Sequence, residues 1–269
     1  MKRAAIFGMG AIGTSLARDW AKQAPKGWEL SAVCARPRQS AAIRDLLPSG
    51  TDVLESVEDL LRMPLDAVIE TVGHASARRY GVDILSAGRD LYLLSSGILA
   101  DKQLHADLIA AARQGQSRII VPTGALAGFD GLLAMALSSE ATVTYRSTKP
   151  AKAWRNTPAD GEFDLDALRE PLVFFRGTAR EAASLYPKNA NLAASVAIGG
   201  VGFEATKVEL VADPAANGNL AELEVQTPNC VLKLQMGGIA ERDNPKSSAI
   251  VSSSVLAALV RQESIIRLG

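Results

Sequence analysis

The chain has 269 residues, of which 48% are hydrophobic, and its 29 lysines and arginines balance its 29 aspartates and glutamates. This length and apolar content suffice for one large domain or two modest ones. A net charge of zero gives no indication of a nucleic-acid or membrane-surface partner. The apolar runs are too short to span a bilayer, and the first residues are typical of a strand rather than a signal peptide. We therefore expect a soluble, cytoplasmic protein.

The two cysteines, Cys34 and Cys230, are too few for a disulfide framework. Each lies in an apolar stretch, so we expect both to be small buried hydrophobic residues in a reducing compartment. No cluster of histidine, cysteine and carboxylate residues has the spacing of a metal site, and no GxSxG elbow or nucleophilic triad is present. The sequence therefore predicts neither metal-dependent nor nucleophilic catalysis.

The most informative motif is Gly8-Met9-Gly10-Ala11-Ile12-Gly13, which follows an apolar run at residues 4–7 and opens a helical stretch at residues 14–22. A strand, a tight glycine turn and a helix in this order form a cradle for phosphates. Gly8 permits the sharp turn, Gly10 allows close backbone approach to a pyrophosphate, and Gly13 lets the helix pack against the strand. We therefore expect this motif, including Ala11 and Ile12, to bind a dinucleotide.

The remainder of the first half alternates between strands and helices. Strands are expected at residues 30–34, 53–54, 66–70, 91–94 and 119–121, and helices at 38–47, 76–87 and 101–114, with a short helix after a capping box at 56–59. The strands have few polar interruptions, as buried parallel strands do. Repeated βα units predict an α/β fold, a doubly wound parallel Rossmann sheet.

The end of the second strand indicates which dinucleotide is bound. An acidic residue there, about twenty positions after the glycines, would favour NAD through the ribose 2′-hydroxyl. This region reads Ala35-Arg36-Pro37-Arg38 and has no carboxylate. Arg36 and Arg38 are suited to a 2′-phosphate, so we expect NADP to bind at least as well as NAD. The alternative is that both arginines are solvated surface charges.

The pattern changes after about residue 122, and a second, more antiparallel α/β domain is expected. Its strands are predicted at residues 142–146, 173–175, 207–211, 223–225 and 231–234, and its helices at 129–137, 179–185 and 191–198; a final helix is predicted at 247–260. We predict a dinucleotide-binding domain at 1–123, a substrate and dimerisation domain at 124–243, and a C-terminal helix at 244–269 that returns to the first domain.

Hydride transfer requires a partner for the proton, and histidine is the common choice. The chain has two, His74 and His105. His105 lies in a predicted helix beside charged residues and is expected to be solvated. His74 follows a strand at the carboxyl edge of the sheet, where ligands bind, but a role at the start of a helix explains it equally well.

Basic residues next to small polar ones recur at three junctions in the second half. Lysines and helix N-termini suit a small carboxylate substrate, so these junctions indicate an anion-binding site. The candidate residues are Lys149, Lys188, Asn189, Lys246, Ser247 and Ser248.

Over nearly its whole length the chain resembles the L-aspartate dehydrogenase family. The likeness rests on the glycine motif, on Pro122-Thr123-Gly124-Ala125-Leu126-Ala127-Gly128-Phe129-Asp130, on Lys149-Pro150-Ala151, on Tyr186-Pro187-Lys188-Asn189-Ala190-Asn191-Leu192-Ala193-Ala194, on Ala212-Asp213-Pro214 and on Asn244-Pro245-Lys246-Ser247-Ser248. The resemblance implies a homodimer of Rossmann and mixed α/β domains. It also implies oxidation of aspartate with NAD or NADP to iminosuccinate, a precursor in NAD biosynthesis that hydrolyses to oxaloacetate and ammonia. It further implies that Ala125 and Asn191 contact the cofactor near the nicotinamide.

The chain departs from the family at one position. Members of the family have an Asn-x-His element after Ala-Asp-Pro, whose histidine is the catalytic acid and base. Here Asn219 matches the asparagine and Ala221 takes the place of the histidine. An engineered substitution, a naturally divergent member and a misalignment all account for this. Alanine cannot transfer a proton, and loss of a general acid or base costs about a hundredfold to ten-thousandfold in rate.

Three hypotheses follow for the function of the chain. The first is an aspartate dehydrogenase scaffold, natural or mutated. The second is an NADP-dependent reductase of another imine or keto acid. The third is a dinucleotide-binding protein without catalytic activity. Turnover of aspartate after Ala221→His distinguishes the first from the others.

Overall fold

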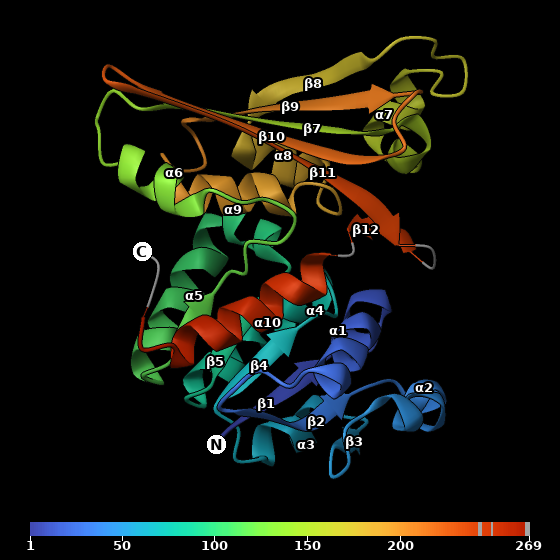
Figure 1. The fold of residues 1–269 in the computed structure, drawn as a ribbon, viewed down its shortest axis with the longest axis vertical. Helices are drawn as coiled ribbons and strands as arrows, with labels where there is room; N and C mark the ends of the chain where they lie inside the picture. The colour runs from blue at the N-terminus through green and yellow to red at the C-terminus, as the bar shows by residue number, and fades with distance from the viewer. Residues whose placement is uncertain (242–243, 249, 267–269) are drawn as a thin grey trace. The chain divides into compact units, whose positions relative to one another are not determined.

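The computed structural model describes residues 1–241, 244–248 and 250–266, with the side chains of 38, 40, 41 and 239–248 outside the described part. The chain divides into two compact units (Figure 1). The first comprises Met1–Gly124 and Val251–Gly269, and the second comprises Ala125–Ile250. Among the described residues, no helix has both the length and the apolar character needed to cross a membrane.

The first unit is built on a six-stranded sheet, here called sheet A. Its strands are β1 Lys2–Phe7, β2 Trp28–Cys34, β3 Asp52–Leu54, β4 Ala67–Glu70, β5 Asp90–Leu93 and β6 Ile119–Ile120. The strand order is β3-β2-β1-β4-β5-β6, and every neighbouring pair is parallel. This is the strand order of a dinucleotide-binding Rossmann fold, so the doubly wound parallel sheet predicted from the sequence is confirmed.

Helices connect the strands of sheet A. They are α1 Ala11–Lys22, α2 Pro37–Ile43, η1 Arg44–Leu46, α3 Val57–Arg62, α4 His74–Ser86, η2 Ser96–Ala100 and α5 Lys102–Gln114. The helix predicted at 38–47 is divided into α2 and η1. At α3, the Ser56 hydroxyl accepts the Asp59 N–H and donates to the Asp59 carboxylate. The carboxylate is thus engaged by the hydroxyl rather than by the Ser56 backbone N–H, so half of the predicted capping box forms.

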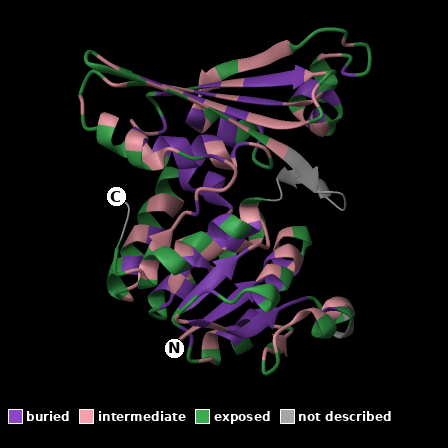
Figure 2. Cartoon of the chain, in the orientation of Figure 1, coloured by how far each residue is buried: buried purple, intermediate pink, exposed green. Residues whose placement is uncertain are grey.

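The core of the first unit follows from its apolar strands. Residues 4–7 and 67–70 are buried along their whole length, as expected of strands covered on both faces (Figure 2). Trp20 of α1 and Trp28 of β2 are almost completely buried in this core. Cys34 is buried as predicted, and burial raises the pKa of its thiol to about 11.

The last helix, α10 Ile250–Glu263, packs its Val255 and Leu259 into the core of the first unit. The Trp28 indole donates to the Leu259 carbonyl at 3.2 Å. The helix that the sequence predicts at residues 247–260 begins three residues later in the structure, at Ile250. Residues 244–248 instead form strand β12, whose backbone pairs with β11. Because β12 is an edge strand, it tolerates Pro245, which lacks an N–H.

The second unit is built on a mixed six-stranded sheet, sheet B. Its strands are β7 Thr142–Pro150, β8 Leu172–Thr178, β9 Thr206–Asp213, β10 Gly218–Thr227, β11 Cys230–Glu241 and β12 Asn244–Ser248, in the order β12-β11-β10-β7-β9-β8. Only the β7–β9 pair is parallel among these neighbours. The predicted second, more antiparallel sheet is therefore confirmed.

The helices of the second unit are α6 Phe129–Met135, η3 Ala151–Trp154, α7 Pro158–Glu162, α8 Ala179–Leu185 and α9 Asn191–Gly199. Helices α6, α8 and α9 lie along one face of sheet B, and α7 lies beside the ends of the strands (Figure 1). Leu223 and Val225 of β10 are buried, and the alternate residues of the strand are more exposed. This period of two is that of a strand with one covered face.

Cys230 is exposed, so the prediction that it is a buried hydrophobic residue is wrong. It is the first residue of β11, directly after the turn that joins β10 to β11, and its backbone N–H donates to the Thr227 hydroxyl. A residue at the tip of a hairpin reaches solvent even when the strand that follows is apolar.

Candidate functional site

The glycine turn between β1 and α1 has the geometry of a phosphate cradle. Gly8 has a φ of +109°, a left-handed conformation that favours glycine. A Cβ on Gly13 would overlap the carbonyl oxygen of Gly8, so only glycine lets α1 approach the turn. A Cβ on Gly10, in contrast, would meet no atom within 4 Å. The turn therefore leaves open the space where a pyrophosphate would rest against the start of α1.

Thr71 holds this turn in place from the neighbouring strand. Its hydroxyl donates to the Gly8 carbonyl at 2.6 Å, and its backbone N–H donates to the Phe7 carbonyl at 2.9 Å. The first helical bond of α1 runs from Thr14 N–H to the Gly10 carbonyl. Because the first N–H groups of a helix have no partner within it, those of Ala11, Ile12 and Gly13 are suited to an anion.

Arg36 lies at the end of β2 and is linked to the glycine turn through Gln39. The Arg36 guanidinium donates to the Gln39 side chain at 3.4 Å, and the Gln39 amide donates to the Met9 carbonyl at 3.3 Å. Arg36 is exposed, and the side chain of Arg38 lies outside the described part of the structure. Gln39 was not predicted from the sequence, because its contact with Met9 depends on the fold.

A buried carboxylate ties together the loops that follow β4 and β5. Glu70, 1% exposed, accepts the Gly73 N–H at 2.8 Å, the Ser95 N–H at 2.9 Å and the Ser95 hydroxyl at 3.0 Å. His74 is the first residue of α4, directly after Gly73. His105 is in α5 and is partly buried. Sequence patterns alone do not indicate the Glu70 contacts.

In the second unit, the structure brings together Lys149 and Asn189. The Lys149 ammonium, at the end of β7, donates to Asn189 Oδ1 at 2.9 Å and lies 5.1 Å from the centre of the Trp154 ring. Asn189 lies between α8 and α9, and its backbone N–H donates to the Tyr186 carbonyl. Burial lowers the pKa of Lys149 to about 8. A partly buried ammonium of this kind is suited to an anionic ligand.

Ala221 lies on β10 opposite Ser147 of β7 and is 5% exposed. The hydroxyl of Tyr145 bonds to Ser147, and burial raises the pKa of this tyrosine to about 12. Because side chains alternate along a strand, Tyr145, Ser147 and Lys149 share one face of β7. Ala221 therefore faces the same side of the sheet as Lys149.

The structure describes the side chains of some of the other predicted site residues but not of all of them. Lys188 is exposed beside Asn189, and Asn191 is the first residue of α9. Ala125, the first residue of the second unit, is partly buried. The side chains of Lys246, Ser247 and Ser248 lie outside the described part of the structure.

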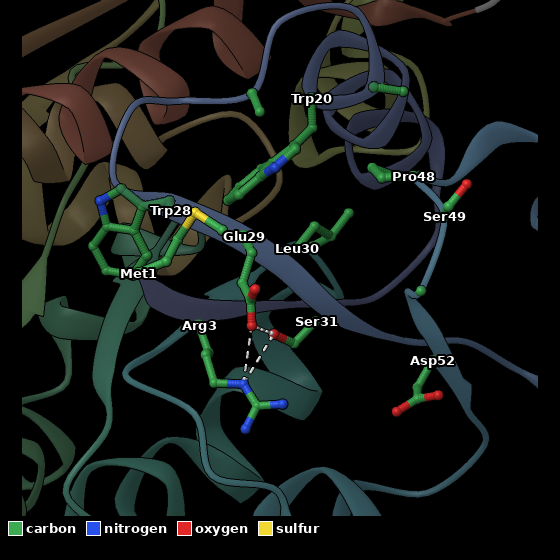
Figure 3. Close-up of a pocket in the computed structure, with 13 residues that line it drawn as sticks. Met1, Arg3, Trp20, Trp28, Glu29, Leu30, Ser31, Pro48, Ser49 and Asp52 are labelled. Atoms are coloured by element: carbon green, nitrogen blue, oxygen red, sulfur yellow. Dashed lines mark hydrogen bonds and ion pairs between the residues drawn. The ribbon is translucent and has the colours of Figure 1, made fainter.

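A pocket of about 460 Å³ lies in the first unit, at the amino ends of β1, β2 and β3 (Figure 3). Its wall includes Trp20, Trp28 and the ion pair between Arg3 and Glu29 at 3.1 Å. Dinucleotides bind at the carboxyl ends of parallel strands. The pocket is therefore distinct from the glycine turn, and none of the predicted site residues whose side chains the structure describes lines it.

Comparisons with known proteins agree with this geometry. Family models described as "Homoserine dehydrogenase, NAD binding domain" and "Aspartate dehydrogenase, C-terminal" match residues 8–122 and 130–262. The crystal structure of aspartate dehydrogenase from Thermotoga maritima is 25% identical and has a TM-score of 0.75, with all of both chains covered. The fold and the glycine cradle define a pyridine-nucleotide-dependent oxidoreductase, whose cofactor is NAD or NADP.

Curated relatives specify the family further. The chain is 38% identical to the L-aspartate dehydrogenase of Ruegeria pomeroyi over 98% of this chain and 94% of the relative. It is also 38% identical to L-aspartate dehydrogenase 2 of Bordetella pertussis over 96% of both chains. The chain belongs to the L-aspartate dehydrogenase family.

Proposed function

We propose that the chain oxidises L-aspartate with NAD or NADP to iminosuccinate, which hydrolyses to oxaloacetate and ammonia. The full-length similarity to named L-aspartate dehydrogenases carries this proposal. We place the reaction in NAD biosynthesis and the protein in the cytoplasm as a homodimer, on the family resemblance. Light scattering of the purified chain tests the dimer, and a monomer would contradict it.

The residues of the first unit fit the cofactor. The open space at Gly10 admits the pyrophosphate, and the N–H groups of Ala11, Ile12 and Gly13 would hold it. Arg36 and Arg38 would meet a 2′-phosphate. Ala125 and Asn191, which belong to the second unit, would contact the nicotinamide end on the family resemblance. When bound, the oxidised nicotinamide supplies a two-electron acceptor for the Cα–H bond of the substrate.

The second unit supplies cations and hydrogen-bond donors for a dicarboxylic amino acid. Some of Lys149, Lys188 and Lys246 would meet the carboxylates, with Asn189, Ser247 and Ser248 donating hydrogen bonds. The contact between Lys149 and Asn189 supports this assignment, because it orients an ammonium that burial has partly desolvated. Lysine also presents three donors, enough to keep its bond to Asn189 and bind a carboxylate.

Ala221 occupies the position that the family resemblance gives to a catalytic histidine. Its methyl group lies on the covered face of β10, opposite Ser147, where a larger side chain would reach over the strand pair. We therefore propose that the chain is a member with reduced proton-transfer capacity at this position. An engineered substitution and natural divergence have the same chemical consequence.

The experiment that tests the function compares the parent chain with Ala221→His. Aspartate oxidation is followed at the NADPH and NADH absorbance, and the reverse reaction is followed with oxaloacetate and ammonia. We expect Ala221→His to raise kcat, because histidine supplies a general acid and base at this position. No turnover of aspartate by either protein would contradict the proposal. Turnover of another imine or keto acid would indicate a reductase of different specificity. Tight NADPH binding without turnover of any substrate would indicate a binding protein.

A further inference from the structure

The helix-covered face of sheet B contains few groups that titrate. Leu232 and Leu234 of β11 face α6, because Cβ atoms on Gly131 and Gly128 of that region would lie 3.5 and 3.0 Å from them. Leu234 pairs with Leu223 of β10, which shares its face with Ala221 two residues away. The strand register therefore places Ala221 on the covered face.

The register also identifies the described side chains of β7, β9, β10 and β11 that share this face. The covered positions are Asn219, Ala221, Leu223 and Val225 on β10, Leu232, Leu234, Met236 and Gly238 on β11, Val143, Tyr145, Ser147 and Lys149 on β7, and Thr206, Val208, Leu210 and Ala212 on β9. Within these sixteen described positions, the titratable side chains are Tyr145 and Lys149.

These two groups flank the pair formed by Ser147 and Ala221, and only one of them titrates near neutral pH. Tyr145 is 1% exposed and bonded to Ser147, and its pKa is raised to about 12 by burial, so it stays protonated. Lys149 has a pKa lowered to about 8 by burial. Diagonal neighbours on an antiparallel pair lie roughly 7–8 Å apart. The flexible four-carbon stem of lysine can cover much of this separation.

The surroundings of Lys149 favour loss of its proton. The charged and titratable groups nearest Lys149 on the neighbouring elements are Tyr186 and Lys188 between α8 and α9, Lys152 on η3, and Asp213 at the end of β9. Lys207 and Glu209 of β9 lie on the opposite face of the sheet. Asp213 accepts the Ala215 N–H, and no described carboxylate forms an ion pair with Lys149. The hydrogen-bond partner of Lys149 is the neutral amide oxygen of Asn189. Because no paired anion stabilises the ammonium, burial shifts the equilibrium of Lys149 toward the neutral amine.

We infer that Lys149 is the proton-transfer residue of this chain, in place of the histidine that is missing at position 221. This inference rests on the proposed oxidation of aspartate. The neutral Lys149 amine accepts one proton from the substrate α-ammonium. The C–H electron pair leaves Cα for the oxidised nicotinamide, and the nitrogen lone pair forms the C=N bond. The products are the protonated lysine, the iminium form of iminosuccinate and the reduced dinucleotide, so charge and electrons balance.

Kinetics of three variants separate proton transfer from simple carboxylate binding. For the parent chain we expect kcat/KM for aspartate to rise with pH, with an apparent pKa about 8. Lys149→Met should lower kcat at least 100-fold. Lys149→Arg should also lose kcat, because arginine stays protonated and cannot accept the proton of the substrate. The exposed Lys152→Met is the matched control and should leave both constants unchanged. Parent-like kcat and pH dependence in Lys149→Arg would overturn the inference.

A direct titration gives a readout that does not depend on turnover. The full-length chain, with and without NADP, is labelled briefly with acetic anhydride across a pH series, and acetylation of each lysine is quantified by mass spectrometry. We expect Lys149 to titrate near pH 8, with acetylation of the exposed Lys152 in the same samples as the internal reference. An ordinary value for Lys149 would overturn the inference.

Ala221→His distinguishes failure of the inference from failure of the proposed function. In the Lys149→Met background, this substitution should restore aspartate oxidation, with the pH dependence moved toward the histidine value of about 6.5. If neither the Ala221→His single variant nor the Ala221→His, Lys149→Met double variant oxidises aspartate, the proposed function fails. If both do, and Lys149→Met alone retains the parent rate, only the assignment of Lys149 fails.

Discussion

The carbonyl oxygen of Gly8 occupies the space in which a Cβ on Gly13 would lie, and the Thr71 hydroxyl oxygen is 2.9 Å from the same point. Helix α1 therefore packs against the turn only with glycine at position 13. We predict that Gly13→Ala destabilises the chain by about 1–3 kcal/mol or more, as overpacking does. Urea denaturation measures this, and an unchanged midpoint would contradict the packing argument.

Gly10 differs from Gly13 because the space beside it is empty and its φ is −77°. We predict that Gly10→Ala keeps the free energy of unfolding within about 0.5 kcal/mol of the parent value. Its methyl group should nevertheless weaken NADPH binding tenfold or more, about 1.4 kcal/mol, by occupying the place of the pyrophosphate. Calorimetric titration with NADPH measures this. Unchanged affinity would place the dinucleotide elsewhere.

Arg36 is the described residue through which the chain would prefer a 2′-phosphate. A hydrogen bond to a charged group contributes about 1.5–3 kcal/mol, so Arg36→Ala should weaken NADPH binding about tenfold or more. Binding of NADH should change little, because it lacks the phosphate. The exposed Arg113→Ala at the end of α5 is the control. If NADH binds the parent chain tenfold more tightly than NADPH, the assignment of Arg36 and Arg38 is wrong.

Glu70 accepts three hydrogen bonds from the loops after β4 and β5. In Glu70→Gln, the amide nitrogen replaces one accepting oxygen and faces an N–H donor. We therefore expect a loss of about 1–3 kcal/mol in the free energy of unfolding. Glu58→Gln, an exposed change on α3, should have no measurable effect. Equal urea midpoints for the two variants would contradict a clamping role for Glu70.

Much of the first unit was predictable because its signals are local. Apolar runs identify β1, β2 and β4, and the glycine motif occupies the expected place between β1 and α1. The last helix shows the limit of such signals. Residues 247–248 continue an apparently helical stretch, yet their backbone pairs with β11, and no local pattern records the neighbouring strand.

The candidate site was less predictable because its contacts join residues distant in the sequence. Lys149 and Asn189 are forty positions apart, and Glu70 and Ser95 are twenty-five apart. The sequence named Lys149 as one of several junction lysines and Ala221 by family resemblance. That they share one face of sheet B follows only from the strand register. Cys230 was misassigned because apolar neighbours do not indicate that a hairpin turn precedes the strand.

The lowered pKa of Lys149 also predicts how the stability of the chain depends on pH. Between about pH 8 and the ordinary lysine value near 10.4, the unfolded chain binds more protons at this residue than the folded chain does. Stability therefore rises with pH across this window, and below pH 8 the buried ammonium costs free energy.

Lys149→Met removes that cost while keeping an apolar stem of similar length. We predict that it raises the free energy of unfolding at pH 7 by on the order of 1–2 kcal/mol, since the residue keeps partial contact with solvent. The gain should vanish above about pH 10.5, where both states of the parent lysine are neutral. Urea denaturation at pH 7, 9 and 10.5 measures it, with Lys152→Met as the control. A loss of stability at pH 7 would show that the Asn189 and Trp154 contacts outweigh the cost of burying the charge.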